Sequence, residues 1–172
     1  MTNSYVVLDL ETTGLSPCED KIIEIAAIKC INGEIVDRLE TLINPERKIS
    51  SHITGITGIS NDMVSDAPII SEVINEVIDF LGDFTLVGHN ISFDFRFIAK
   101  VAGDFGMRYN AGGIDTLKLA KKHIKDIGSR SLESLCEYFG IETIHHRAMA
   151  DVMSTYEIFN RFIKMPEFIW KP

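Results

Sequence analysis

The stretch YVVLDLETTGL, residues 5–15, decides the architecture of this 172-residue chain. Residues 5–11 form a short, largely apolar run that is typical of a buried strand, and the TTGLSP that follows predicts a turn. Asp9 and Glu11 stand two positions apart, so on a strand their side chains project from the same face. The chain therefore begins with a buried strand that carries two carboxylates side by side.

The next segments predict a sheet that opens with antiparallel strands. Residues 21–31 and 34–43 are two β-rich runs separated by Asn32-Gly33, a strong hairpin signal. Together with the first strand they form three antiparallel strands. The sheet thus starts as a meander.

Beyond the hairpin, helical and strand patterns alternate. Apolar residues recur at helical spacing over 68–81, which predicts an amphipathic helix that ends at Gly82. A short strand over 85–88 follows, then a helix that Ser92 would cap, a last short strand at 114–115 and three more helices. This order predicts an α/β fold, in which a mixed central sheet of three antiparallel strands and then parallel ones is flanked by helices.

Composition bounds the class of protein. With 45% hydrophobic and 24% charged residues, the chain resembles an ordinary globular protein, and we expect a single domain over 1–172. No apolar run approaches the roughly 20 residues that a membrane span needs, and the first residues lack a secretory signal. We therefore expect a cytoplasmic protein. Cys18, Cys30 and Cys136 are too far apart to suggest a zinc site or a disulfide framework.

The charge balance disfavours a tight nucleic-acid binder with a long footprint. The chain has 25 acidic and 17 basic residues, whereas non-specific binding rests on Lys and Arg that neutralise phosphates. An enzyme that grips only the last few nucleotides through metal ions is still compatible, because bound cations supply positive charge. We expect weak, distributive binding.

Three separated pieces of sequence carry candidate catalytic groups. Asp9 and Glu11 would repel each other in a buried strand unless their pKa values are raised or a cation lies between them, although D-x-E alone fits a solvated strand end better. Asp94 lies near the start of a helix, where a carboxylate also complements the helix dipole. His146 and Asp151 are five residues apart, so we place the histidine in a loop and Asp151 on the next helix.

These pieces, DLETTGL (9–15), GHNISFDF (88–95) and HRAMAD (146–151), match three family motifs in order and spelling. The chain resembles the DEDDh 3′-to-5′ exonucleases from residue 5 to about 164. Within them it is most similar to the proofreading exonucleases of bacterial replicative polymerases, the epsilon type of DNA polymerase III. The resemblance implies the ribonuclease-H-like fold. Its H-x-x-x-x-D pattern selects His146 over the neighbouring His145.

An all-oxygen ligand set favours hard cations, Mg²⁺ or Mn²⁺, over zinc. Two such ions roughly 3.5–4 Å apart can activate a water and stabilise the departing oxygen in phosphoryl displacement. The resemblance implies that Asp9, Glu11 and Asp151 bind one ion, that Asp9 bridges to the second and that Asp94 acts partly through water. It implies His146 as general base and a nucleoside 5′-monophosphate as product.

The resemblance also implies residues that contact the substrate. Thr12, Thr13, Gly14 and Leu15 resemble the segment that receives the terminal nucleotide, with Leu15 as an apolar wedge against its base. Further matches are His52, in a segment that overhangs the site, and Asn90. Phe93 also suits a nucleobase, although its i, i+4 spacing with Phe97 favours a core role.

The sequence leaves three functions open. The first is a 3′-to-5′ exonuclease on single-stranded or frayed DNA ends, of the proofreading or repair type, working with a polymerase subunit or alone. The second is a DEDDh exoribonuclease on RNA ends or short oligoribonucleotides. The third is an inactive interaction module, against which the five intact catalytic-type residues argue. We expect no C-terminal docking extension, because only 165–172 follow the last helix, and the oligomeric state is open.

Overall fold

The structure is a computed structural model that describes residues 4–142 and 147–165. Its elements in chain order are β1 (Ser4–Thr12), β2 (Ile22–Ile31), β3 (Glu34–Leu42), α1 (Ser51–Thr57), α2 (Asn61–Val64), α3 (Ile70–Leu81), β4 (Thr85–Gly88), α4 (Ser92–Asp104), β5 (Gly113–Asp115), α5 (Thr116–His123), α6 (Leu132–Phe139) and α7 (Ala148–Ile163).

The five strands form one mixed sheet in the order β3-β2-β1-β4-β5. β1 pairs antiparallel with β2 and β2 antiparallel with β3, whereas β1–β4 and β4–β5 are parallel. In the β2–β3 turn Asn32 and Gly33 both have positive φ, 54° and 85°, as the primed hairpin turns require. The predicted fold class is confirmed.

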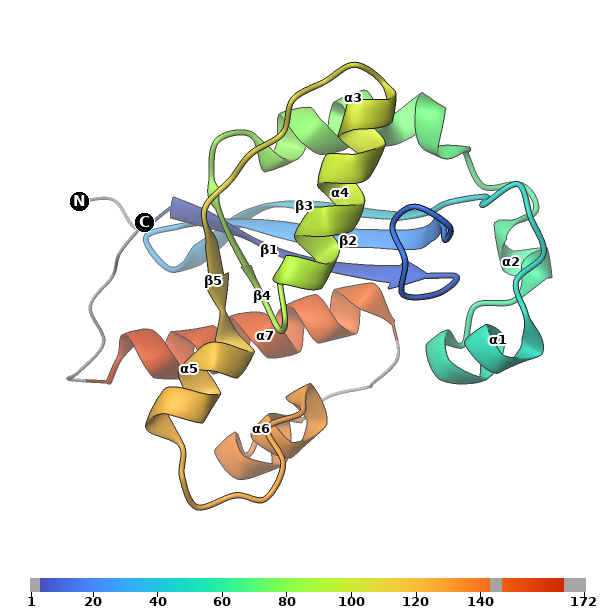
Figure 1. The fold of residues 1–172 in the computed structure, drawn as a ribbon. Coiled ribbons are helices and arrows are strands. Elements are labelled where there is room, and N and C mark those ends of the chain that lie inside the picture. The colour runs from blue at the N-terminus through green and yellow to red at the C-terminus, as the bar shows by residue number, and fades with distance from the viewer. Residues whose placement is uncertain (1–3, 143–146, 166–172) are drawn as a thin grey trace.

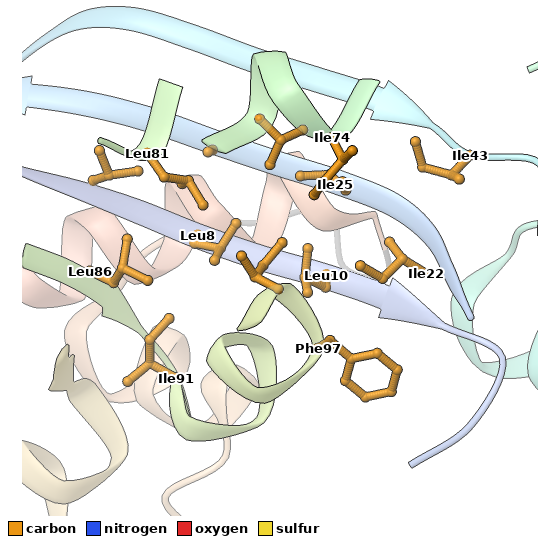
Figure 2. Packing of buried hydrophobic residues seen from close by; sticks show 14 residues of the cluster. Leu8, Leu10, Ile22, Ile25, Ile43, Ile74, Leu81, Leu86, Ile91 and Phe97 are labelled. Carbon is orange, nitrogen blue, oxygen red and sulfur yellow. The ribbon is translucent and has the colours of Figure 1, made fainter. Parts of the chain in front are cut away.

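Helices cover both faces of this sheet. Figure 1 shows α3 and α4 on one face and α7 on the other, with α5 and α6 beside α7. Three even positions of β1, which carry Val6, Leu8 and Leu10, are buried toward α3 and α4. Figure 2 shows Leu8 and Leu10 within this cluster, together with Phe97 of α4. These three side chains of β1 thus belong to the hydrophobic core.

The odd positions of β1 face the opposite helix. Tyr5 and Val7 pack in a second buried cluster with Val152 and Phe159 of α7, and the rings of Tyr5 and Phe159 meet edge to face at 5.1 Å. Because side chains alternate along a strand, the next odd positions, which carry the carboxylates of β1, also face α7.

The structure corrects the predicted start of two helices. α3 begins at Ile70 and not at 68, because Ile69 is extended and its N–H donates to the Glu72 carboxylate at 2.9 Å. The prediction that Ser92 caps α4 is wrong. Ile91 holds the cap position in helical conformation, and Ser92 is the first helical residue.

Two short helices were not predicted. α1 and α2 are capped by Ser50 and Ser60, whose hydroxyls accept backbone N–H groups of the first turn. Both helices lie where β1 ends and α7 begins (Figure 1). Among the described residues, no helix is both long and apolar enough to cross a membrane.

Candidate active site

The first feature of the site is a group of three carboxylates from two elements. Asp9 and Glu11 lie on β1, and Asp151 lies in the first turn of α7. One carboxylate oxygen of each lies within 4.8 Å of the others. Glu11 and Asp151 are 140 positions apart in the chain, and the three residues meet because α7 crosses the face of β1 that carries the odd side chains.

Asp94 joins the site from the other side of β1. Its Oδ1 accepts the backbone N–H of Leu10 at 3.1 Å, and the residue is only 4% exposed. The parallel β1–β4 ladder has its last registered pair at Val7 and Val87, so Leu10 lies beyond it. Asp94 thus supplies an acceptor where the neighbouring strand has ended, and this bond holds the start of α4 against β1.

Gly88 permits that close approach. A Cβ on Gly88 would lie 2.6 Å from Cδ1 of Ile91, which is the end of a flexible side chain, and also 3.0 Å from Cβ of Ile91 and 3.1 Å from the carbonyl oxygen of Leu8. The last two contacts are tighter than ordinary van der Waals contact, and a change of the Ile91 rotamer does not relieve them. The turn from β4 into α4 therefore favours glycine at this position.

The carboxylates repel one another in a buried place. Burial raises the pKa of Asp9 well above its ordinary value, and Asp94, Asp151 and Glu11 raise it further. Burial also raises the pKa of Glu11 to about 7, with Asp151 as the next cause. The pKa of Asp94 rises to about 8 through burial, although the hydrogen bond from Leu10 lowers it in part. A site of this kind favours a cation.

The donor set fits a hard divalent ion. The three grouped side chains offer carboxylate oxygens alone, the ligands preferred by Mg²⁺ and Mn²⁺. Asp94 lies outside that group of three but close enough to be the largest charged contributor to the raised pKa of Asp9. The acidic cluster is therefore the place where such an ion fits.

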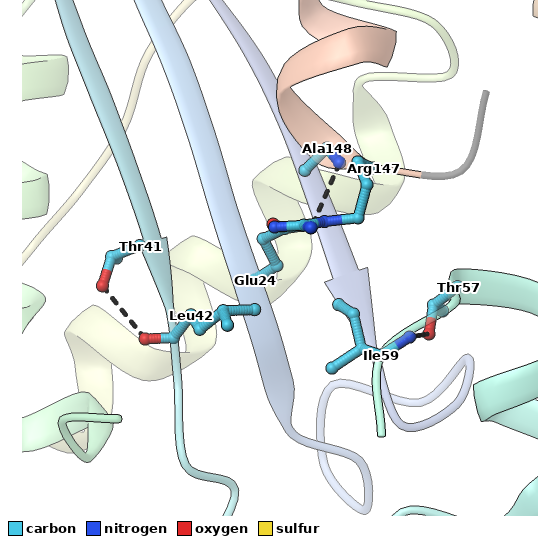
Figure 3. Close-up of polar contacts among 7 residues, drawn as sticks. All are labelled: Glu24, Thr41, Leu42, Thr57, Ile59, Arg147 and Ala148. Atoms are coloured by element: carbon cyan, nitrogen blue, oxygen red, sulfur yellow. Dashed lines mark hydrogen bonds and ion pairs between the residues drawn. The ribbon is translucent and has the colours of Figure 1, made fainter. Parts of the chain in front are cut away.

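Glu24 is a further charged residue beside the site that was not predicted from the sequence. This residue lies on β2, opposite Glu11 in the β1–β2 register, and is fully buried. Its Oε1 accepts two hydrogen bonds from the Arg147 guanidinium, at 2.6 and 3.0 Å, and its Oε2 accepts the N–H of Ala148 at 3.0 Å. Figure 3 shows this contact between β2 and the start of α7. The signal in the sequence was a single charge within the apolar run IIEIAAI.

The predicted substrate turn is ordered by its own hydrogen bonds. The hydroxyl of Thr12 donates to the carbonyl of Gly14 at 2.6 Å, and that of Thr13 accepts the N–H of Lys21 at 3.0 Å. A Cβ on Gly14 would lie 2.4 Å from Oδ2 of Asp20, so a larger residue here would displace that carboxylate from its hydrogen bonds with Thr13 and Ser16. Leu15 is 81% exposed, which leaves its side chain free to contact a ligand.

The remaining predicted contact residues lie on α1, on α4 and in the turn between β4 and α4. His52 is exposed on α1. Asn90 has a left-handed φ of 69°, and its N–H donates to Oδ1 of Asp115 at 3.0 Å. Phe93 packs against the core cluster of α3 and α4, with its ring 5.0 Å from that of Phe97. The structure supports the core role for Phe93. His145 and His146 lie outside the described residues.

A mixed five-stranded sheet with this acidic cluster on β1, α4 and α7 defines the ribonuclease-H-like nucleases, the class that the motifs predicted. A family model described as "Exonuclease" (RNase_T) matches residues 6–159. The chain belongs to this exonuclease family. The predicted family and class of enzyme are thereby confirmed.

Curated relatives include PolC-type DNA polymerases III. The chain is 44% identical over 168 residues to the PolC-type DNA polymerase III of Caldanaerobacter subterraneus subsp. tengcongensis, which is 97% of this chain and 12% of that protein. It is 44% identical over 164 residues to the PolC-type polymerase of Thermotoga maritima, again 12% of that protein. The chain thus spans about an eighth of the length of these relatives.

Solved exonucleases share the fold. Exonuclease X in complex with 5′-overhanging duplex DNA aligns with a TM-score of 0.72 and 29% identity, over 95% of each chain. E. coli exonuclease I in complex with a dT13 oligonucleotide aligns with a TM-score of 0.84 over 94% of this chain and 41% of that chain. At 18% identity the second likeness shows the fold alone.

Proposed function

We propose that this chain is a 3′-to-5′ exonuclease that hydrolyses the terminal phosphodiester of DNA and releases nucleoside 5′-monophosphates. The observation that carries the proposal is the meeting of Asp9, Glu11 and Asp151 within 4.8 Å, on an exonuclease-family fold. DNA is favoured because the polymerase relatives copy DNA and the exonuclease X structure holds it. We propose one domain over 1–172, and the cytoplasmic location stays a prediction.

Asp9, Glu11 and Asp151 would hold one divalent ion, with Asp9 shared by a second ion near Asp94. Bound Mg²⁺ or Mn²⁺ supplies an activated water and stabilises the departing oxygen. The protein holds the acidic groups in place before substrate arrives. β1 fixes two of them by its core packing, and the Leu10 N–H fixes Asp94.

Proton transfer is assigned to His146, which would act as the general base. An imidazole with the ordinary pKa of about 6.5 is neutral and able to accept a proton at neutral pH. In the sequence, His146 directly precedes Arg147, the cap residue of α7, and stands five positions before Asp151. His145 has no assigned role.

The terminal nucleotide would lie over the turn after β1. The exposed Leu15 offers an apolar surface for its base, and Thr12, Thr13 and Gly14 shape the turn beneath it. His52 and Asn90 would complete the binding site for the terminal nucleotide. Phe93 has a weaker claim because the core occupies its ring.

The experiment is digestion of end-labelled single strands of DNA and RNA by the purified chain with Mg²⁺, Mn²⁺ or EDTA. We expect labelled mononucleotide to be released from 3′-labelled DNA before any is released from RNA, and only when metal is present. A strand labelled at its 5′ end should shorten stepwise. Faster digestion of RNA would favour the exoribonuclease function, and no digestion of either would favour an inactive interaction module.

A DNA polymerase is the proposed partner, since the curated relatives are polymerases of which this chain matches one part. With a polymerase partner the chain would act in proofreading. A chain that acts alone would act in repair instead. Addition of a polymerase and a mismatched primer tests this, because proofreading should remove mismatched 3′ ends before matched ones.

A further inference from the structure

The start of α7 is not capped by the side chain of its own cap residue. Four N–H groups at a helix N-terminus have no partner within the helix, and a side chain at the cap position usually satisfies one of them. In α7 the cap residue is Arg147, whose side chain makes no capping bond. The site nevertheless depends on this end of the helix, because Asp151 lies in its first turn.

Glu24 of β2 supplies the missing cap from across the fold. Its Oε2 accepts the N–H of Ala148, the first residue of α7, at 3.0 Å. A carboxylate at this position also complements the positive end of the helix dipole. Glu24 and Ala148 are 124 residues apart, so this bond joins the helix to the sheet.

The second oxygen of Glu24 binds the residue before the helix. Oε1 accepts from both Nε and Nη2 of Arg147, a charge-assisted pair that fixes the guanidinium in one plane. The backbone carbonyl of Arg147 accepts the N–H of Asp151 at 3.1 Å. A continuous path of hydrogen bonds thus runs from Glu24 through Arg147 to Asp151.

The path also returns to the other ligands. Glu24 and Glu11 are cross-strand partners, and both side chains face α7. One side chain therefore ties the helix that carries Asp151 to the strand pair that carries Asp9 and Glu11. The Arg147 charge offsets that of Glu24, so the tie adds no net negative charge to a crowded acidic site.

We propose that Glu24 is a positioning residue, which acts through Arg147 and Ala148 to hold Asp151 in register with Asp9 and Glu11. The expected effect of Glu24 on catalysis rests on the proposed function. Its expected effect on metal binding rests on the structure alone. Partners that orient metal ligands in this way typically contribute 10–100-fold in metal affinity or activity.

The test is Glu24→Gln, which keeps the size of the side chain and an acceptor for Ala148 but removes the charge that binds Arg147. The matched control is Tyr156→Phe. It removes a 2.7 Å hydrogen bond from Tyr156 to the carbonyl of Gly33, which ties the same helix to the β2–β3 turn away from the site. Dissociation constants for Mn²⁺ are measured by electron paramagnetic resonance, alongside melting temperature and kcat at saturating metal.

Glu24→Gln should weaken Mn²⁺ binding by about 10–100-fold and lower kcat. Tyr156→Phe should lower the melting temperature but leave the Mn²⁺ constant within about twofold of the wild type. If Glu24→Gln does not fold, Arg147→Lys replaces it, because Lys keeps the charge but not the two-bond contact and should weaken Mn²⁺ binding by a smaller factor.

An unchanged Mn²⁺ constant in a folded Glu24→Gln or Arg147→Lys protein would overturn the proposal, as would a wild-type protein that binds no Mn²⁺. The readout is separate from the nuclease assay. A wild type that binds Mn²⁺ tightly but digests nothing would reject the proposed function, and the effect of Glu24→Gln on Mn²⁺ binding would still decide the role of Glu24.

Discussion

Glu11 and Glu24 are opposite each other in the β1–β2 register, but their carboxylates have different surroundings. Glu24 is bound by the Arg147 guanidinium and by the Ala148 N–H. The pKa of Glu11 is raised to about 7 by burial and by Asp151, with Glu24 also contributing. One glutamate is satisfied by the protein, and its partner is left in the acidic group that suits a metal ion.

The first prediction concerns the metal ligands. Asp9→Ala and Asp94→Ala should each reduce magnesium-dependent digestion of single-stranded DNA by at least about 10³-fold, because each removes oxygen donors that together contribute several kcal/mol. Circular dichroism should show that both variants are folded. Turnover similar to wild type in either folded variant would reject its role.

The second prediction separates the two adjacent histidines. His146→Ala should lower kcat by about 10²–10⁴-fold, the usual contribution of general-base catalysis, whereas His145→Ala should lose little. Rates are compared at saturating Mg²⁺ and substrate. The opposite ranking would show that the H-x-x-x-x-D motif has been aligned one residue out of place.

The third prediction concerns pH and the metal-free protein. The pKa values of Glu11 and Asp94 in the folded state, about 7 and about 8, lie above the ordinary carboxyl values near 4 that apply when the chain unfolds. A raised pKa contributes stability that is complete below the unfolded value and is lost as the pH rises through the folded value.

In EDTA the melting temperature should therefore fall as the pH rises from about 5.5 to 8.5. Asp94→Asn should flatten this slope, since its amide does not ionise and can still accept the Leu10 N–H. A slope that is the same in wild type and Asp94→Asn would contradict the raised pKa of Asp94.

The fourth prediction concerns metal and stability. Mg²⁺ at ten times its dissociation constant should stabilise the native state by about 1.4 kcal/mol, which is a measurable rise in melting temperature. Asp151→Asn should shrink the rise, and it should raise the melting temperature in EDTA by removing one repelling charge. Thermal scans with EDTA, Mg²⁺ and Mn²⁺ check both effects, and equal metal shifts in the two proteins would mean that Asp151 is no ligand.

The fifth prediction concerns the turn that delivers Asp94. Gly88→Ala should cost about 1–3 kcal/mol, the usual range for overpacking, and should reduce activity by displacing Asp94. Gly103→Ala, in the same helix as Asp94, is the control, because a Cβ there meets nothing within 4 Å. Chemical denaturation should show the control to be neutral or slightly stabilised, and an equally stable Gly88→Ala would refute the steric argument.

Local patterns in the sequence determined most elements of the fold. The Asn32-Gly33 dipeptide predicts the hairpin because the tight turn needs a positive φ at both central residues, which few residue types adopt. Both angles are positive in the structure. Strand periodicity also placed Asp9 and Glu11 on one face. The α1 and α2 helices were missed because their seven and four residues are too short for a periodic pattern.

Tertiary structure alone decided which of the acidic residues meet and how they are held. Periodicity states that Asp9 and Glu11 share a face, but not that α7 covers it, since the side on which a helix packs depends on contacts such as Tyr5 with Phe159. Periodicity also does not predict the contacts of Glu24, whose partners are 123 and 124 residues away. Sequence records the chemistry and local geometry of each residue, whereas proximity between distant residues is a property of the packed chain.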